Sequence, residues 1–598
     1  MKIRRNWFNI FAMVIYEIVI LYALTCTIGK LGNGQEYPYL LKGRWMLFII
    51  IATILVFLFG TLWTRLGMRE KMCRHTKTAG IIEAISVFAV ILSGTAIRIW
   101  YINNMPMKPL SDYKTYFEIA QMLKAGTLLE LGTGYCDYVA IFPHVLGYPR
   151  LLAFLFHFSG DSVMAALYLN VFFAMGTVLI SWIITRRLVG RMGAFFTLMA
   201  LNFWPSMILY NNFVAGEYYF TFLFVICVLI FTIQLQGRGY THSHPWMVVV
   251  ELIFLGVLMA VDATIRPMIM IYVVSIILCM IHARNTLPVV DKNDIPLGSR
   301  ATAMGWQRCL IVLFVYLAVS KIFTAGTAYT VNRDISGGTS SFGYNLLVGL
   351  NTDSYGGWNK EDAAYLYKSL DATGSAQEAQ LTCRDLAIQR LKADPDVLLN
   401  LFVHKFEVLW GNDDYGASWN ILFMDQQKNL TTQREKFLYN MMDISDLYYA
   451  TMLLLAGIAG IIIYRKKVDA TYSMILMILG TVVLHLFVEN QNRYHYHVLP
   501  LLAILGGVAF AGIMRNSAHR VIRKKFRRQY ELQQESERKR IIFEQAEETE
   551  KIQKIREESF QQQFDMEKAL KEGHITIVAS EQAVKNVTGT EHKAKDEK

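Results

Sequence analysis

The sequence has 598 residues, of which 54% are hydrophobic and 18% are charged, and its mean hydropathy is +0.31. Soluble domains carry about 25% charged residues, so this composition excludes an ordinary soluble enzyme. Repeated apolar runs of about 20 residues explain the difference, because runs of this length cross a bilayer as helices. The formal net charge of +11 is concentrated in loops where the positive-inside rule expects it, and no interleaved basic and aromatic patch indicates nucleic-acid binding. The sequence predicts an all-α polytopic membrane protein.

Residues 1–79 are predicted to form a transmembrane hairpin and a cytoplasmic loop. Apolar runs cover 8–28 and 45–64, and five basic residues follow within 65–77. The basic start is signal-like, but no small-residue cleavage site follows the first run, which indicates a retained helix. Because basic loops stay in the cytoplasm, the next run, 80–101, leads to the extracytoplasmic side.

The loop 102–142 is therefore predicted to be the first large outer loop. Four of its residues recur at helical spacing and share one face of a helix: Tyr113, Tyr116, Phe117 and Ala120. Asp112 stands at the start of this helix. One interpretation is an N-cap, in which the carboxylate accepts from an orphan backbone N–H. The other is a carboxylate held at the membrane surface for proton chemistry. The two interpretations are compatible, because one carboxylate has two oxygens.

The predicted membrane core extends over 80–325. Residues 143–158, interrupted by Gly147 and Pro149, are predicted to form a juxtamembrane or re-entrant helix, since the alternation of basic loops leaves no room for another crossing. Further spans are predicted at 163–185, 192–210, 216–236, 246–264, 267–283 and 305–325, and, within a C-terminal membrane segment 446–514, at 446–464, 470–488 and 495–514. The count is about twelve spans, with both termini in the cytoplasm.

Two regions outside the spans have distinct compositions. Residues 326–445 contain glycine-rich segments and helical patterns at 361–393 and 395–410, and are predicted to form a small extracytoplasmic domain. Residues 515–598 begin with a basic juxtamembrane stripe and continue as a charged helix to about 572 without a sustained heptad. We expect a cytoplasmic tail with no catalytic role, of which about the last 25 residues are disordered.

The seven cysteines do not form the pattern of a disulfide framework. Four lie in apolar runs, where cysteine behaves as a small hydrophobic residue. Only Cys136 and Cys383 fall in segments predicted to be extracytoplasmic, so a bridge between these two is the one that remains open.

Ionisable residues near membrane depth are costly to bury and therefore indicate function. They gather in four clusters: Asp112 with its tyrosines; Asp137 with His144 and Tyr148; Asp262 with Arg266; and the run Glu489 to His497. Each cluster also has a structural interpretation. Arg266 can be a snorkelling arginine at a helix end, Asp137 an ordinary loop acid, Glu217 a helix-dipole partner, and the Glu489 to His497 run an interfacial polar belt.

The order and topology of these motifs resemble the GT-C-fold membrane glycosyltransferases, the group that includes protein O-mannosyltransferases and lipid A aminoarabinose transferase. The resemblance covers about 80–515 and rests on Pro109-x-Ser111-Asp112-x-x-x-Tyr116-x-x-x-Ala120, Tyr148-Pro149, Trp204-Pro205 with Gly216-Glu217, Arg266-Pro267, and Glu489-x-Gln491-x-Arg493-Tyr494 before Pro500. The chain departs from the mannosyltransferases at Asp112, which is followed by Tyr113 where they have an Asp-Glu pair. The segment 326–445 matches no known acceptor-binding module.

This resemblance implies a polyprenyl-phosphate sugar donor and an inverting, hexosyl- or mannosyl-type transfer to a protein, lipid or cell-envelope glycan outside the cytoplasm. It also implies an acidic base in the first outer loop, which maps to Asp112. Arg266 and Arg493 are expected to bind the donor phosphate, because arginine forms charge-assisted bonds with phosphate. Seven residues are expected to shape the substrate pocket: Tyr113, Tyr116, Asp137, Tyr148, Glu217, Tyr494 and His495. No metal is expected to be required, although the outer acids Asp112, Asp137 and Glu217 are able to recruit a divalent cation.

Two non-enzymatic functions remain as alternatives. A transporter or a flippase for lipid-linked carbohydrate predicts charges near the midplane and two related halves. The sequence has no internal repeat and its polar clusters lie at one face, which favours the enzyme. A scaffold organised by the tail 515–598 is the third possibility. The chain contains no Walker A loop and no Gly-x-Ser-x-Gly elbow, so an ATP-driven pump and a serine hydrolase have little support.

Overall fold

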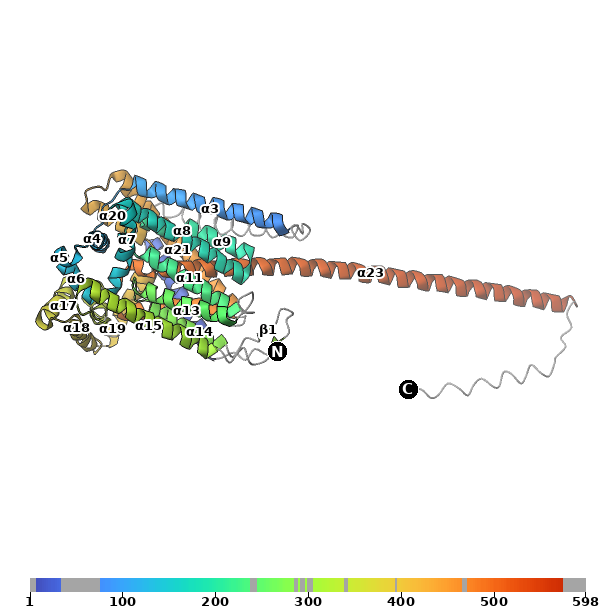
Figure 1. The fold of residues 1–598 in the computed structure, drawn as a ribbon. Coiled ribbons are helices and arrows are strands. Elements are labelled where there is room, and N and C mark those ends of the chain that lie inside the picture. The colour runs from blue at the N-terminus through green and yellow to red at the C-terminus, as the bar shows by residue number, and fades with distance from the viewer. Residues whose placement is uncertain are drawn as a thin grey trace. The chain divides into compact units, whose positions relative to one another are not determined.

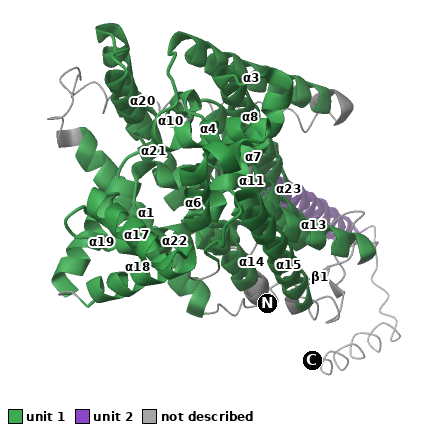
Figure 2. Cartoon of the chain, turned by 60° about the vertical axis from the view of Figure 1, so that its left-hand side comes forward, with its two compact units in different colours: residues 1–515 green, residues 516–598 purple. Residues whose placement is uncertain are grey.

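The computed structural model describes residues 7–33, 76–236, 245–283, 289–290, 296–297, 305–337, 342–392, 395–464 and 470–573. The predicted span 45–64, nearly all of the basic loop 65–77 and the last 25 residues lie outside this described part. The chain divides into two compact units, Met1–Arg515 and Asn516–Lys598 (Figure 2). In the second unit the predicted charged helix is confirmed, since helix α23 ends at Lys571.

Nine helices of the described residues are long and apolar enough to cross a membrane. They are α1 (Trp7–Asn33), α3 (Thr76–Asn104), α8 (Val163–Val189), α11 (Glu217–Gln236), α13 (Pro245–Ala263), α15 (Gly305–Val331), α21 (Thr432–Tyr464), α22 (Ala470–Phe487) and the start of α23 (Leu499–Lys571) with the 3-10 turn η4 (Asn492–Val498) before it. A shorter apolar helix, α14 (Ile269–Ala283), lies at the predicted span 267–283. The prediction of an all-α polytopic membrane protein is confirmed, and one two-stranded hairpin, β1 (Val289–Val290) with β2 (Pro296–Leu297), accompanies the helices.

The predicted span 192–210 is broken instead of continuous. It consists of α9 (Arg191–Asn202) and α10 (Pro205–Leu209), which with the turn η2 (Tyr210–Asn212) is bent by 47° from α9. Pro205 has no N–H to donate, so the helix cannot continue through it. At the end of α9 the backbone carbonyl of Asn202 accepts a hydrogen bond from Nη1 of the buried Arg98 of α3 at 2.9 Å.

Helix α7 (Gly147–Ser159) is short and begins at a close backbone contact. Its 13 residues extend about 20 Å, less than the hydrocarbon core of about 30 Å, which agrees with the prediction that 143–158 does not cross. The Gly147 N–H donates to the carbonyl of Thr264 at 3.1 Å, and a Cβ on Gly147 would stand 2.3 Å from that oxygen. Glycine at this position lets α7 pack against the turn that carries Arg266.

Short helices gather at one end of the bundle (Figure 1). They are α4 (Ser111–Ala125), α5 (Leu128–Leu131), α6 (Thr133–Ile141), the turn η1 (Pro143–Leu146), α16 (Gly343–Gly349), α17 (Lys360–Thr373), α18 (Ala376–Arg390) and α19 (Pro395–Trp410). Helix α20 (Tyr415–Gln426) leads back toward α21. The predicted pattern 361–393 is two helices, separated at Gly374, whose φ of 67° is the left-handed conformation that glycine tolerates.

The loop 102–142 and the segment 326–391 share one hydrophobic core. Ile119, Val139 and Leu146 lie in the same buried cluster as Leu347 and Leu366. Cys136 and Cys383 both belong to this core as free, buried thiols, so the bridge left open by the sequence is not formed. The predicted border at 445 lies inside the continuous helix α21, which begins at Thr432.

Candidate functional site

A cavity of about 1020 Å³ lies where the short helices meet the ends of the spanning helices. Its walls come from α4, α6, η1, the turn before α14, α16 and α17, the end of α22, and η4. Five of the predicted site residues line it: Asp112, Tyr116, Arg266, Arg493 and Tyr494. The cavity therefore brings together positions that the sequence separates by several hundred residues.

Asp112 lies in the first turn of α4 and faces Arg493. Its Oδ2 accepts from Nη2 of Arg493 at 2.7 Å, and its side chain is 43% exposed to the cavity. The N-cap interpretation is wrong: the N-cap residue is Leu110, and no side chain caps this end of the helix. Ser111, between the two, has a φ of +51°, a left-handed conformation that is strained for a residue with a Cβ.

Arg493 is held rigidly by the turn η4 and by aromatic rings. Its side chain is 3% exposed, and Nη1 donates to the hydroxyl of Tyr113. The guanidinium carbon lies 4.7 Å from the ring centroid of Trp419 and 5.2 Å from that of Tyr113, both within cation–π range. The interpretation of 489–497 as an interfacial belt therefore does not apply to Arg493, which points into the protein.

Arg266 is paired with a different carboxylate. Its Nη2 donates to Oε1 of Glu217 at 2.5 Å, and the side chains are 19% and 7% exposed. Burial lowers the pKa of Arg266, but Glu217, Tyr116 and Tyr494 together outweigh it, and the net shift is upward. Because its head is ion-paired inside the protein, Arg266 is not a snorkelling arginine. Glu217 itself lies behind Arg266, in the first turn of α11.

Three of the predicted tyrosines, two on α4 and one on α7, pack in layers beside the cavity. Tyr113 is buried and its hydroxyl lies 2.9 Å from that of Tyr210. Tyr116 lines the cavity and packs edge-on against Tyr148, with ring centroids 6.0 Å apart. Tyr148 is buried behind it and donates to Oδ1 of Asn170 at 2.9 Å. Only Tyr116 of these three reaches the cavity, and the other two support it and Arg493.

Asp137 and His495 lie away from the cavity lining. Asp137 forms a half-exposed ion pair with Arg333 at 2.9 Å. His495 is fully buried, with Nε2 3.0 Å from Oδ1 of Asp413. Asp413 also accepts from the side chains of Trp204 and Ser206, each at 2.6 Å. The His495 to Asp413 contact thus joins η4 to the break between α9 and α10.

The cavity contains residues that the sequence interpretation did not place in the site. Glu489 lines the wall, and its pKa is raised by burial and by the nearby charge of Asp112. Its Oε1 accepts from neutral groups only, the amide of Gln491 at 2.9 Å and the hydroxyl of Tyr494 at 3.3 Å. His144 also lines the cavity, and burial lowers its pKa to about 3, so it is neutral at pH 7. Both residues belonged to the polar clusters in the sequence, but spacing alone did not select them.

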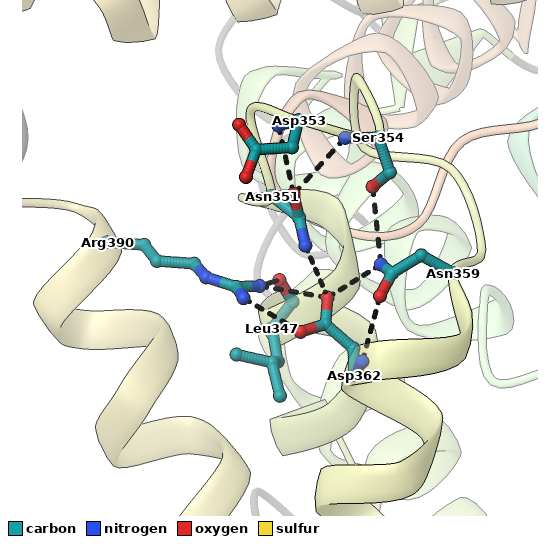
Figure 3. A network of polar contacts seen from close by, with 7 residues as sticks. All are labelled: Leu347, Asn351, Asp353, Ser354, Asn359, Asp362 and Arg390. Atoms are coloured by element: carbon teal, nitrogen blue, oxygen red, sulfur yellow. Dashed lines mark hydrogen bonds and ion pairs between the residues drawn. The ribbon is translucent and has the colours of Figure 1, made fainter.

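The outer rim of the cavity carries the half-exposed ring of Trp358. Figure 3 shows the network that fixes the segment leading to it. Asp362 accepts from Arg390 through both oxygens, at 2.7 and 2.9 Å, and from Nδ2 of Asn351 at 2.9 Å and of Asn359 at 2.8 Å. Burial raises the pKa of Asp362, but these hydrogen bonds outweigh it and the net shift is downward.

The three acids considered for a cation do not converge. Asp112, Asp137 and Glu217 are each paired with a different arginine, namely Arg493, Arg333 and Arg266 respectively. Within the described ranges there is also no group of three or more His, Cys, Asp or Glu side chains arranged to hold a metal ion. The three acids therefore do not form one shared cation site.

Comparison with known proteins gives structural neighbours. No family model matches the chain, and no curated protein matches it. Among solved structures it is similar to the apo oligosaccharyltransferase of Archaeoglobus fulgidus (TM-score 0.38, 10% identity, 74% of this chain and 52% of that chain). It is also similar to AglB of that organism in complex with an inhibitory peptide and a dolichol-phosphate (TM-score 0.38, 11% identity, 73% and 52%). A third is ArnT of Cupriavidus metallidurans bound to undecaprenyl phosphate (TM-score 0.30, 10% identity, 73% and 78%). The chain spans about half the length of the archaeal structures that it matches.

Proposed function

We propose that this protein is a membrane glycosyltransferase that moves a sugar from a polyprenyl-phosphate donor to an extracytoplasmic acceptor with inversion. The observation that carries the proposal is the convergence of Asp112, Arg266 and Arg493 on one cavity at the ends of the spanning helices. A carboxylate is suited to accept a proton, two guanidinium groups are suited to hold a phosphate, and the adjoining apolar helices are suited to a lipid chain.

In the proposed reaction an acceptor hydroxyl attacks the anomeric carbon of the donor sugar. Its proton goes to the carboxylate of Asp112 while the new C–O bond forms. The bond between the anomeric carbon and the phosphate oxygen breaks, and its electron pair stays on the phosphate. Arg266 and Arg493 stabilise the charge that develops there, and Tyr116 and Tyr494 shape the space for the sugar. The sugar is a hexose in this proposal, and a protein, a lipid or a cell-envelope glycan serves as the acceptor.

The proposed topology is derived from the positive-inside rule, by which loops rich in Lys and Arg lie in the cytoplasm. Both termini lie in the cytoplasm, and the cavity faces the extracytoplasmic side, where lipid-linked sugars replace cytosolic nucleotide sugars as donors. The cavity, whose lining includes Asp112 and Trp358, would then be the outer site. Residues 326–445 would contribute to acceptor binding. Trp358 in the cavity lining supports that role, because its ring is half-exposed and the neighbouring Asn359 belongs to the Asp362 network.

The test is transfer by the purified full-length protein in detergent. The donor lipid that co-purifies is first identified by mass spectrometry, and its sugar is then followed into an envelope acceptor fraction. Asp112→Asn is expected to lower the transfer rate by about a hundredfold or more, the usual contribution of a general base. Asp161→Asn is the matched control, because Asp161 accepts from Lys124 at the same 2.7 Å and its side chain is 38% exposed. Full transfer by Asp112→Asn would show that the assigned base is wrong.

A further inference from the structure

In this structure the proposed base, Asp112, is ion-paired with Arg493, one of the two arginines proposed to bind the donor phosphate. Both residues line the cavity, and Asp112 accepts from Nη2 of Arg493. The contact occupies Oδ2 of the carboxylate and holds the side chain toward Arg493, so this oxygen is not free to accept the proton of a hydroxyl. The same contact takes up a donor that a phosphate oxygen would need. The observed state is therefore unsuited to either role, and the contact between Asp112 and Arg493 has to open before transfer.

The two cavity arginines differ in how easily their partners can leave. Glu217 is 7% exposed, so separating it from Arg266 would leave a carboxylate buried without a cation, which is costly. Asp112 is 43% exposed and can be hydrated at once when it separates from Arg493. The pair of Arg266 and Glu217 is therefore permanent, and the pair of Arg493 and Asp112 is exchangeable.

Asp112 is the partner that moves. The guanidinium of Arg493 stays in place against the rings of Trp419 and Tyr494, which lie on other elements than Asp112. The first turn of α4, by contrast, has no side-chain cap and begins with the left-handed Ser111. An uncapped helix end with a strained residue opens at low cost.

We infer that the phosphate of the donor displaces Asp112 from Arg493, so that the base is released only when a donor is bound. This inference rests on the proposed function. An anionic phosphate oxygen takes over the hydrogen bond from Nη2, and the freed carboxylate turns to the acceptor hydroxyl. While no donor lipid is bound, Asp112 stays paired with Arg493 and does not act as the base. No bond is broken in the exchange itself, which replaces one charge-assisted hydrogen bond by another of the same kind.

If Asp112 and the donor phosphate compete for Arg493, removing the charge of Asp112 strengthens phosphate binding. The probe is undecaprenyl phosphate, and its dissociation constant is measured on the full-length protein in detergent micelles. Asp112→Asn is expected to tighten binding about three- to tenfold, since one competing ion pair is lost. Asp161→Asn is the matched control, because it removes a carboxylate that accepts from Lys124 at the same 2.7 Å and is not among the cavity-lining residues. It is expected to change binding by less than about twofold.

A double-variant comparison separates competition from a general effect of charge. In an Arg493→Gln background, Asp112→Asn is expected to tighten binding no further, because there is no guanidinium left to compete for. Equal or weaker binding by Asp112→Asn, the same gain from Asp161→Asn, or an undiminished gain in the Arg493→Gln background would each overturn the inference. If the unaltered protein transfers sugar but these results fail, only the exchange is wrong. If the unaltered protein binds no undecaprenyl phosphate and transfers no sugar, the proposed function fails with it.

Discussion

Arg266 and Glu217, 49 positions apart, form a nearly buried ion pair in which Arg266 lines the cavity and Glu217 lies behind it. Breaking such a pair is more costly than replacing it, because the remaining charge is left in a medium of low dielectric. Arg266→Met is therefore expected to lower the free energy of unfolding by about 3–5 kcal/mol. Thermal unfolding in detergent, followed by intrinsic fluorescence, measures this change.

The matched control for this pair is Arg333→Met. Its ion pair with Asp137 is 41% exposed on both sides and should contribute less than about 1 kcal/mol. The double variant Arg266→Met with Glu217→Leu is expected to recover much of the loss, since no unpaired charge remains. A double variant as unstable as Arg266→Met alone would contradict this explanation.

Arg98 is a second case in which a buried arginine holds the fold. It is fully buried in α3, and its guanidinium donates to the carbonyls of Gly94 at 3.2 Å and Asn202 at 2.9 Å. Arg98→Met removes the side-chain donor to the carbonyl of Asn202, and we expect a loss of about 2–3 kcal/mol in unfolding free energy. Arg98→Lys keeps a cation at the helix end and should lose less. Chemical denaturation of the two variants side by side decides this, and equal losses would contradict it.

The Asp362 network predicts a dependence of stability on pH. The folded-state pKa of Asp362 lies below its ordinary value near 3.8. Its contribution is therefore complete above about pH 5 and is lost as the pH falls through the lowered folded pKa. Asp362→Asn is expected to be less stable at pH 7, where it lacks the bidentate pair with Arg390, and to lose less stability on acidification. Melting temperatures between pH 7 and pH 2.5 test this, and parallel curves for the two proteins would rule it out.

Removal of the tail separates the enzyme from a scaffold. The first compact unit ends at Arg515, and the last apolar spanning segment, Asn492–Met514, lies wholly within it. A chain that ends at Arg515 is therefore expected to keep its rate of sugar transfer in detergent within about twofold, because no cavity residue comes from the tail. A loss of transfer in a variant that still elutes as a folded monodisperse protein would assign the tail a role in the reaction.

The spans were predictable because their signal is local. Runs of about 20 apolar residues identify a membrane helix without reference to its neighbours, and basic loops order them. The helix that carries Asp112 was likewise visible from the spacing of Tyr113 and Tyr116. The break at Trp204-Pro205 was missed, although Pro205 carried the signal, because the apolar character continues through it.

The site was only partly predictable, because the spacing of residues along the sequence does not show which side chains pair in the folded protein. Asp112 and Arg493 are 381 positions apart, and both were selected from their separate local patterns. Nothing in the sequence distinguished them from His495, which turns inward to Asp413, or from Asp137, which pairs with Arg333 at the surface. Glu489 shares the run of Arg493, but only the fold reveals that its side chain reaches the cavity.

The core shared by the outer loop and the later helices has a consequence for biosynthesis. Ile119 and Val139 are translated long before Leu347 and Leu366, which complete their packing. At about 5–20 residues per second, roughly ten to forty seconds separate the emergence of the two halves. During this interval α6 can already pack against α5 and η1, but the part of its buried face that later contacts α18 has no native partner yet. Correct assembly of the cavity is thus a late event in the synthesis of the chain.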